Sequence, residues 1–86
     1  MPVIYCAVDM FAVGQAVRVT DGNTTTTIYC NASDLASTVA TLCREKDITN
    51  VHFYGNEDYL QSIVDSTKMN YNSLYNCGRP LNIEVN

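Results

Sequence analysis

After three strand-like segments, the spacing of apolar residues in this chain changes from the two-residue period of strands to the longer period of helices. Up to residue 30, three segments alternate in polarity or are rich in β-branched side chains. From residue 34 to about residue 46, apolar side chains recur three and four residues apart, as in a helix with one buried face. The 86 residues have room for one core. We therefore expect a single domain, 1–86, in which a group of strands precedes the first helix.

Three strands are predicted before that change. The first, Val3 to Phe11, is mostly apolar on both faces, which is typical of a central strand covered on both sides. The second spans Gln15 to Thr20, and Asp21-Gly22-Asn23 then forms a turn, because these residues tolerate the positive φ of tight hairpins. The third, Thr24 to Cys30, is rich in β-branched threonine. These segments are predicted to form an antiparallel meander.

Two helix–strand pairs complete the predicted order. Ser33 is a suitable N-cap for a helix from Asp34 to Lys46. A strand from Ile48 to Tyr54 follows, and because a helix precedes it we expect it to lie parallel to the first strand. A second helix is then expected to fray after Met69, and the residues from Leu81 to Asn86 alternate as a last strand.

The predicted order is therefore β-β-β-α-β-α-β. The fold class is α/β (α+β), with a single five-stranded mixed sheet and two helices, and right-handed crossovers give the sheet order 3-2-1-4-5. This connectivity resembles the minimal core of the ribonuclease H-like superfamily. The stretch from Ile48 to Glu57, with the closing Ile83 to Asn86, also resembles small proteins of phages and mobile elements. That second resemblance implies a viral accessory protein that binds and inhibits a host protein, such as a CRISPR effector or another antiviral defence component.

The ribonuclease H-like resemblance implies one alternative function, a metal-dependent nuclease. Nucleases of that superfamily hold two metal ions with carboxylates from the first strand, the end of the fourth strand and a later helix. Asp9, Glu57 and Asp58 stand at two of those places. However, Met10-Phe11-Ala12 replaces the glycine that usually accompanies the first carboxylate, and no acidic helix follows the last strand. We therefore expect these three acids to be structural, with no catalytic or metal-binding residues and no enzymatic activity.

The other chemically reactive side chains favour structural roles. His52 lies in a predicted interior strand, where a packed, hydrogen-bonded ring is expected. The cysteines form no Cys-x-x-Cys motif, which predicts free thiols, with Cys6, Cys30 and Cys43 in the core and Cys77 in a loop. The glycines are isolated, so we expect no phosphate-binding loop and no cofactor. The absence of a signal sequence and of a long apolar run predicts a protein of the host-cell cytoplasm without membrane contact.

Tyrosine and asparagine gather near the end of the second predicted helix. Six tyrosines occur in the chain, and this stretch suits recognition because tyrosine offers contact area and asparagine offers adaptable hydrogen bonds. A loop with local side-chain caps explains the same composition equally well. The net charge of −4 and the lack of a basic cluster predict that another protein, and not nucleic acid, is the partner. The candidate residues here are Tyr71, Asn72, Tyr75 and Asn76.

The third predicted strand is a second candidate surface. It lies at an edge in the order 3-2-1-4-5, yet Thr24 to Cys30 contains no charge and no proline, the usual protections of an edge. We expect it to pair with its own copy in a two-fold homodimer or with a strand of a target protein, unless the hairpin's twist leaves it solvated. A small-molecule or nucleotide-sequestering protein, with a pocket at a subunit interface, is the remaining alternative. The candidate contact residues are Thr24, Thr25, Thr27 and Tyr29.

Overall fold

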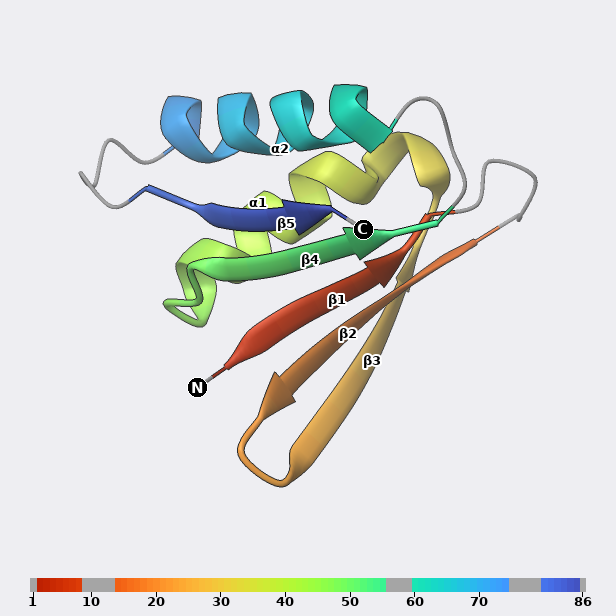
Figure 1. Cartoon of the computed structure of the whole chain (residues 1–86), viewed down its shortest axis with the longest axis vertical. Coiled ribbons are helices and arrows are strands. Elements are labelled where there is room, and N and C mark those ends of the chain that lie inside the picture. The colour runs from red at the N-terminus through yellow and green to blue at the C-terminus, as the bar shows by residue number, and fades with distance from the viewer. Residues whose placement is uncertain (1, 9–13, 56–59, 75–79, 86) are drawn as a thin grey trace.

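The computed structural model describes residues 2–8, 14–55, 60–74 and 80–85. Within this part of the chain, a five-stranded sheet carries two α-helices and a short 3-10 helix (Figure 1). The predicted order of strands and helices is confirmed. The elements are β1 (Val3–Ala7), β2 (Gln15–Asp21), β3 (Thr24–Cys30), η1 (Ala32–Asp34), α1 (Leu35–Glu45), β4 (Asn50–Tyr54), α2 (Leu60–Leu74) and β5 (Asn82–Val85).

The strands are arranged as β3-β2-β1-β4-β5, which confirms the predicted sheet order. β2 pairs antiparallel with both β1 and β3, whereas β4 pairs parallel with both β1 and β5. The sheet is therefore mixed, with a hairpin on one side and parallel pairs on the other. β3 has the bounds expected from the threonine run.

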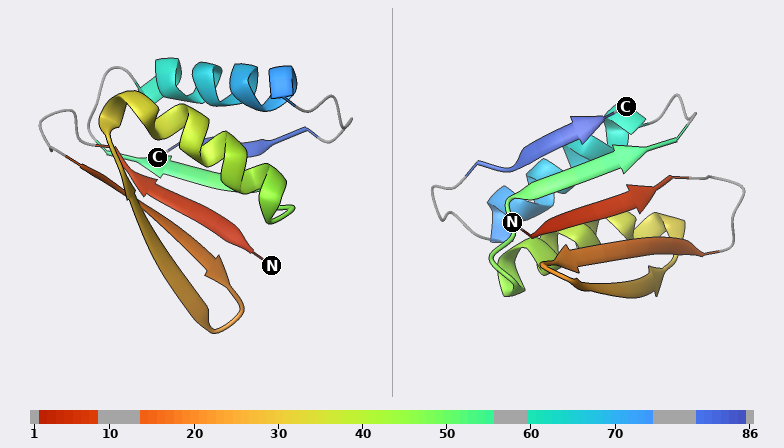
Figure 2. Two further views of the ribbon diagram at one scale, coloured as in Figure 1. Left: turned by 180° about the vertical axis from the view of Figure 1, so that it is seen from behind. Right: turned by 60° about the horizontal axis from the view of Figure 1, so that its bottom comes forward.

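Both helices lie on the same face of the sheet, as the views in Figure 2 show. α1 connects β3 to β4, α2 connects β4 to β5, and both connections step in the same direction across the sheet. Since such crossovers are right-handed, two steps in one direction place both helices on one side. The expectation that β1 is covered on both sides is therefore wrong, and Tyr5 is 36% exposed. We call the uncovered side the open face; its side chains include Val3, Tyr5, Arg18, His52, Tyr54 and Glu84.

The core lies between the sheet and the helices. Phe53 of β4 and Ile4 of β1 are fully buried, and they face the apolar stripe of α1, which includes Leu35 and Val39. Partly buried Ile28, Cys30, Ile63, Leu81 and Ile83 pack against this cluster. The other buried apolar residues are Cys6, Val8, Val17, Val19, Ala40, Leu42, Cys43, Ile48, Val51, Leu60, Val64 and Tyr71.

Two predicted boundaries near the first helix and the first strand are corrected. Ser33 is not the N-cap of α1 but lies within η1, and α1 begins after Asp34. The Ser37 hydroxyl donates a hydrogen bond to the Asp34 carbonyl oxygen, 3.0 Å away. β1 ends at Ala7 instead of Phe11, and residues 9–13 lie outside the described part of the chain.

The second helix is longer than the asparagines after Met69 suggest. α2 continues to Leu74, and Tyr71 is only 4% exposed. The buried residues of α2 are spaced three and four apart, so Tyr71 prolongs an apolar stripe whose burial outweighs the low helix propensity of asparagine. Asn70 also donates a hydrogen bond to the Ser66 carbonyl oxygen at 2.8 Å. No helix in the described part of the chain is both long and apolar enough to cross a bilayer.

Gly55 follows β4 at a point where the backbone leaves no room for a side chain. Its φ is +148°, in a region that L-residues rarely adopt, and a Cβ at this position would lie 2.5 Å from the Val8 carbonyl oxygen. Nearby, the Val8 N–H donates a 2.8 Å hydrogen bond to the Tyr54 carbonyl oxygen. This close approach joins the ends of the two central parallel strands.

Replacing Gly55 with alanine is expected to lower the free energy of unfolding by about 2–4 kcal/mol, because backbone strain adds to the clash with Val8. Gly22→Ala is the matched control, since φ at Gly22 is also positive, +62°, but no atom lies within 4 Å of its Cβ position. Its expected cost is about 1–2 kcal/mol. Urea unfolding followed by circular dichroism measures both values. Equal losses in the two variants would contradict the importance of the contact with Val8.

Two buried thiols belong to the core. Cys6, Cys30 and Cys43 are free, and Cys6 and Cys43 are buried as predicted, whereas Cys30 is half-buried and Cys77 lies outside the described residues. Burial raises the pKa of Cys6 from 9.0 to about 12, with smaller contributions from Cys30 and Cys43. Burial also raises the pKa of Cys43 to about 12. Neither thiol therefore ionises near neutral pH in the folded protein.

A thiol reagent at pH 8 is expected to modify Cys6 and Cys43 far more slowly than Cys30, because only thiolates react and burial keeps these two protonated. After unfolding without reductant, all four cysteines should react. The free energy of unfolding should also fall as pH rises from about 9 to about 12, where unfolded thiols are ionised and folded ones are not. Mass spectrometry of the labelled protein counts the sites, and fewer than four after unfolding would contradict the free-thiol assignment.

Candidate interaction site

The edge strand β3 presents an unprotected backbone. Its seven residues pair with β2 without a bulge, from Thr24 opposite Asp21 to Cys30 opposite Gln15. β5, at the other edge, has four residues. Edge strands usually carry charges, prolines or bulges that prevent pairing with another chain, and β3 has none of these. β3 is therefore the longer and less protected edge of the sheet.

The hairpin register decides which backbone groups of β3 are free. Gly22 and Asn23 form a two-residue turn between Asp21 and Thr24, and of the two only Gly22 has a positive φ. This pattern is typical of hairpin turns with glycine at the first central position. The pair that closes the turn is hydrogen-bonded, and bonded and non-bonded pairs then alternate along the strands. The backbone groups that point away from β2 are therefore those of Thr25, Thr27 and Tyr29.

The side chains of these three residues lie on the open face. Thr25 stands opposite Thr20, with 3.4 Å between their hydroxyl oxygens, and Thr27 stands opposite Arg18. Tyr29 is 76% exposed. Thr24 is exposed too, but alternation places its side chain on the helix side of the sheet. The structure thus brings Thr25, Thr27 and Tyr29 together along one exposed edge and places Thr24 beside them.

The open face carries aromatic and charged side chains that the sequence did not reveal as a group. The His52 ring lies 5.8 Å from the Tyr5 ring and 5.9 Å from the Tyr54 ring, measured between centroids. Arg18 donates a 3.1 Å hydrogen bond to the Tyr54 hydroxyl. His52 lies on an interior strand, as predicted, and its ring is half-buried on this face. The signal that predicts such a face is the common direction of the two crossovers, not any local motif.

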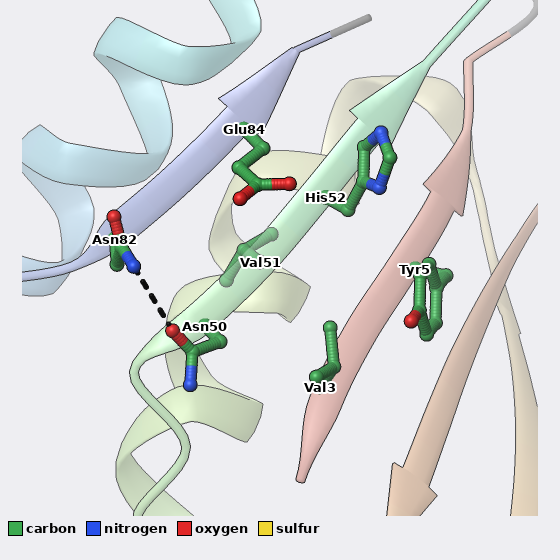
Figure 3. A pocket seen from close by; sticks show the side chains of 7 residues that line it. All are labelled: Val3, Tyr5, Asn50, Val51, His52, Asn82 and Glu84. Carbon is green, nitrogen blue, oxygen red and sulfur yellow. Dashed lines mark hydrogen bonds between the residues drawn. The ribbon is translucent and has the colours of Figure 1, made fainter. Parts of the chain in front are cut away.

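A hollow of about 200 Å³ lies on the open face over β1, β4 and β5 (Figure 3). The Asn82 side-chain amide closes one end by donating a 3.2 Å hydrogen bond to the Asn50 side-chain oxygen. The hollow is smaller than the roughly 300–1,000 Å³ typical of small-molecule pockets. Three other hollows, of about 370, 590 and 330 Å³, do reach that range, so volume alone does not decide against the nucleotide-sequestering alternative. The residues that line the hollow on the open face are Val3, Tyr5, Asn50, Val51, His52, Asn82 and Glu84.

The three carboxylates considered for a metal site lie outside the part of the chain that the structure describes. Asp9, Glu57 and Asp58 are not among the described residues. Within the described ranges, no group of three or more His, Cys, Asp or Glu side chains could hold a metal ion. Val8, which precedes Asp9, and Gly55, which lies two residues before Glu57, have their backbones close together at the end of the sheet where β1 and β4 terminate.

The tyrosine- and asparagine-rich stretch from Tyr71 to Asn76 has only one candidate residue that the structure shows to be exposed. Tyr71 was predicted to contact a partner, but its ring is buried in the core beneath α2, so this prediction is corrected. The reason is its helical spacing from Val64 and Thr67, which puts it on the inward side of α2. Asn72 is exposed on α2. Tyr75 and Asn76 lie outside the described residues.

Comparison with protein-family models, curated proteins and solved structures finds no match for this chain. The resemblances to the ribonuclease H-like core and to small phage proteins therefore remain sequence-based predictions. Function has to be inferred from the exposed surfaces, of which the β3 edge and the open face are the best defined.

Hydrogen exchange followed by NMR tests the register of the edge. At micromolar protein concentration, the amides of Thr25, Thr27 and Tyr29 are expected to exchange quickly, because they point away from β2. The amides of Thr26 and Ile28 should be protected by their bonds to β2. Protection of Thr27 together with fast exchange of Thr26 would show that the other set of amides faces outward.

Proposed function

We propose that this protein is a non-catalytic binding module that recognises another protein by adding one of its extended segments to the β3 edge. The observation that carries the proposal is the seven-residue, uncharged and regular edge of β3. Three of its residues have backbone groups directed away from β2. An added strand would pair with these groups, as in β-augmentation.

The exposed side chains of the edge would provide specificity. Thr25, Thr27 and Tyr29 alternate on the open face, so they would lie beside the alternate side chains of an added strand. Tyr29 is the largest of them and the most exposed, which suits a residue that anchors a partner. Substitution of Tyr29 would then weaken binding without affecting the core.

The distribution of charge favours a protein partner over nucleic acid. The chain has a net charge of −4. The described basic side chains are dispersed, with Arg18 on β2, Arg44 near the end of α1, Lys46 after it and Lys68 on α2. Binding to a phosphate backbone relies on several cations that act together. Among the described residues, no such group of cations adjoins the β3 edge.

The sequence resemblance suggests the class of the partner. A small phage or mobile-element accessory protein would act in the host cytoplasm, where its target would be a host protein of an antiviral system such as CRISPR. In this proposal the module inhibits its target by occupying a strand-pairing segment. A second copy of the chain, paired edge to edge, is the other occupant that β3 can accept.

Thr27→Pro tests the proposal, because proline removes one outward N–H without breaking a hydrogen bond to β2. Thr27→Ala is the matched control, since it removes the side chain and keeps the N–H. Affinity capture from bacterial host lysate is expected to recover a protein with wild type and Thr27→Ala, and at least about tenfold less with Thr27→Pro. Circular dichroism checks that all three are folded.

Two results separate the possible outcomes. If β3 pairs with its own copy, light scattering should show a dimer for wild type and for Thr27→Ala but a monomer for Thr27→Pro. If every captured protein binds the proline variant as well as wild type, and wild type and both variants have the same mass in solution, the β3 edge is not a binding site.

A further inference from the structure

We infer that the open face is a self-association surface, on which a second copy of this chain packs sheet against sheet about a two-fold axis. The axis runs parallel to the strands and passes between β1 and β4. This surface is distinct from the β3 edge, so the inference goes beyond the proposed function and does not depend on it.

The strand registers align one row of side chains across the open face. Thr27 lies opposite Arg18, Arg18 opposite Tyr5, Tyr5 opposite His52, and His52 opposite Glu84. The row therefore has a cation on β2, two rings in the middle and a carboxylate on β5. Its charges differ in sign at the two ends, which a copy rotated by 180° can complement.

The spacing of the strands makes this row self-complementary. Neighbouring strands lie about 4.8 Å apart, so an axis midway between β1 and β4 has Tyr5 and His52 about 2.4 Å to either side. Arg18 on β2 and Glu84 on β5 then lie about 7.2 Å to either side of the same axis. Rotation about the axis places Arg18 of the second copy over Glu84 of the first, and Tyr5 over His52. Each dimer would contain both interactions twice.

The rows above and below also match across this axis. Ala7 lies opposite Tyr54 in the register, so the rotation sets the large ring of one copy over the small side chain of the other. In the row on the other side, Thr20 lies opposite Val3, and Asn50 lies opposite Asn82. The rotation places Thr20 over Asn82, which are both polar. The match beyond the charged row is therefore partial, because the same rotation sets the apolar Val3 over the polar Asn50.

The two charges at the ends of the row lack opposite charges within the described part of the chain. Glu84 is exposed on β5, and its side chain has no hydrogen bond or ion pair with any described residue. Arg18 is exposed and donates only to a neutral group there, the Tyr54 hydroxyl at 3.1 Å. Both are therefore available for an intermolecular pair. The rings between them add contact area of the kind enriched at interfaces.

The expected dimer is weak and leaves the edge free. Four strands and three rows cover roughly 20 Å by 20 Å, or on the order of 400 Å² per copy, about half of a standard interface. Dissociation constants in the tens of micromolar and sensitivity to salt are expected. β3 lies about 12 Å from the axis, beyond the position of β5 in the second copy. Each dimer would thus present two open β3 edges and could bind bivalently.

Charge reversal with complementation tests the inference. Arg18→Glu puts two carboxylates together in the homodimer, and Glu84→Arg puts two cations together, so each variant should dimerise at least about tenfold more weakly than wild type. An equimolar mixture should recover the dimer, because one copy then carries two carboxylates and the other two cations at the facing positions. Sedimentation velocity at low salt, with protein from about 10 to 500 μM, measures the dissociation constant of wild type, of each variant and of the mixture.

The controls keep the result specific. Lys68→Glu and Asp65→Arg change the net charge by the same amounts on exposed positions of α2, and their mixture should behave like wild type. Thr27→Pro should leave the open-face dimer intact, whereas an edge-to-edge dimer would be lost in that variant and unaffected by charge reversal. The inference is overturned if wild type stays monomeric at 500 μM, if either single variant dimerises like wild type, or if mixing fails to restore the dimer.

Discussion

The parallel pairing of β1 with β4 determines how the rest of the sheet is covered. β3 is parallel to β1 because two antiparallel steps separate them, so the chain must cross the sheet through α1 to reach β4. A second crossover through α2 continues in the same direction to β5. Right-handed crossovers then leave both helices on one side. One face is buried, and no helix in the described part of the chain covers the other.

This arrangement divides the chemistry of each strand between two environments. On the helix side, side chains such as Ile4, Cys6 and Phe53 form a closed core, and burial keeps the Cys6 thiol protonated by raising its pKa to about 12. On the other side, Tyr5 and His52 are only partly covered. In a chain of 86 residues one such core provides the main stability, so the second face is available for contacts with other molecules.

The two proposed interactions use different groups: the β3 edge offers backbone hydrogen bonds, and the open face offers side chains. At β3, alternation of hydrogen-bonded pairs directs three sets of backbone groups outward, and any extended segment can pair with them. On the open face β2, β1 and β4 each pair with a neighbouring strand on both sides, so specificity would come from side chains in register, above all Arg18 and Glu84. The functions are therefore separable by single substitutions.

The sequence determined those features that depend on local pattern and on general rules of chain connection. The threonine run gave β3 its bounds, the apolar stripe gave α1, and the order of elements with right-handed crossovers gave the position of every strand. The burial of Tyr71 could also have been predicted from the sequence, because Tyr71 continues the helical spacing of Val64 and Thr67 on α2. The abundance of asparagine around it pointed instead to a loop.

Only the tertiary structure decided which residues from different strands share a surface. Arg18, Tyr5, His52 and Glu84 lie far apart in the sequence, and each stands between two apolar residues of its strand, an ordinary alternation that does not link one of them to another. Their alignment depends on three strand registers, and a shift of one residue in any of them would move a side chain to the other face. Register is set by packing of the whole buried face against the helices, which no local segment encodes.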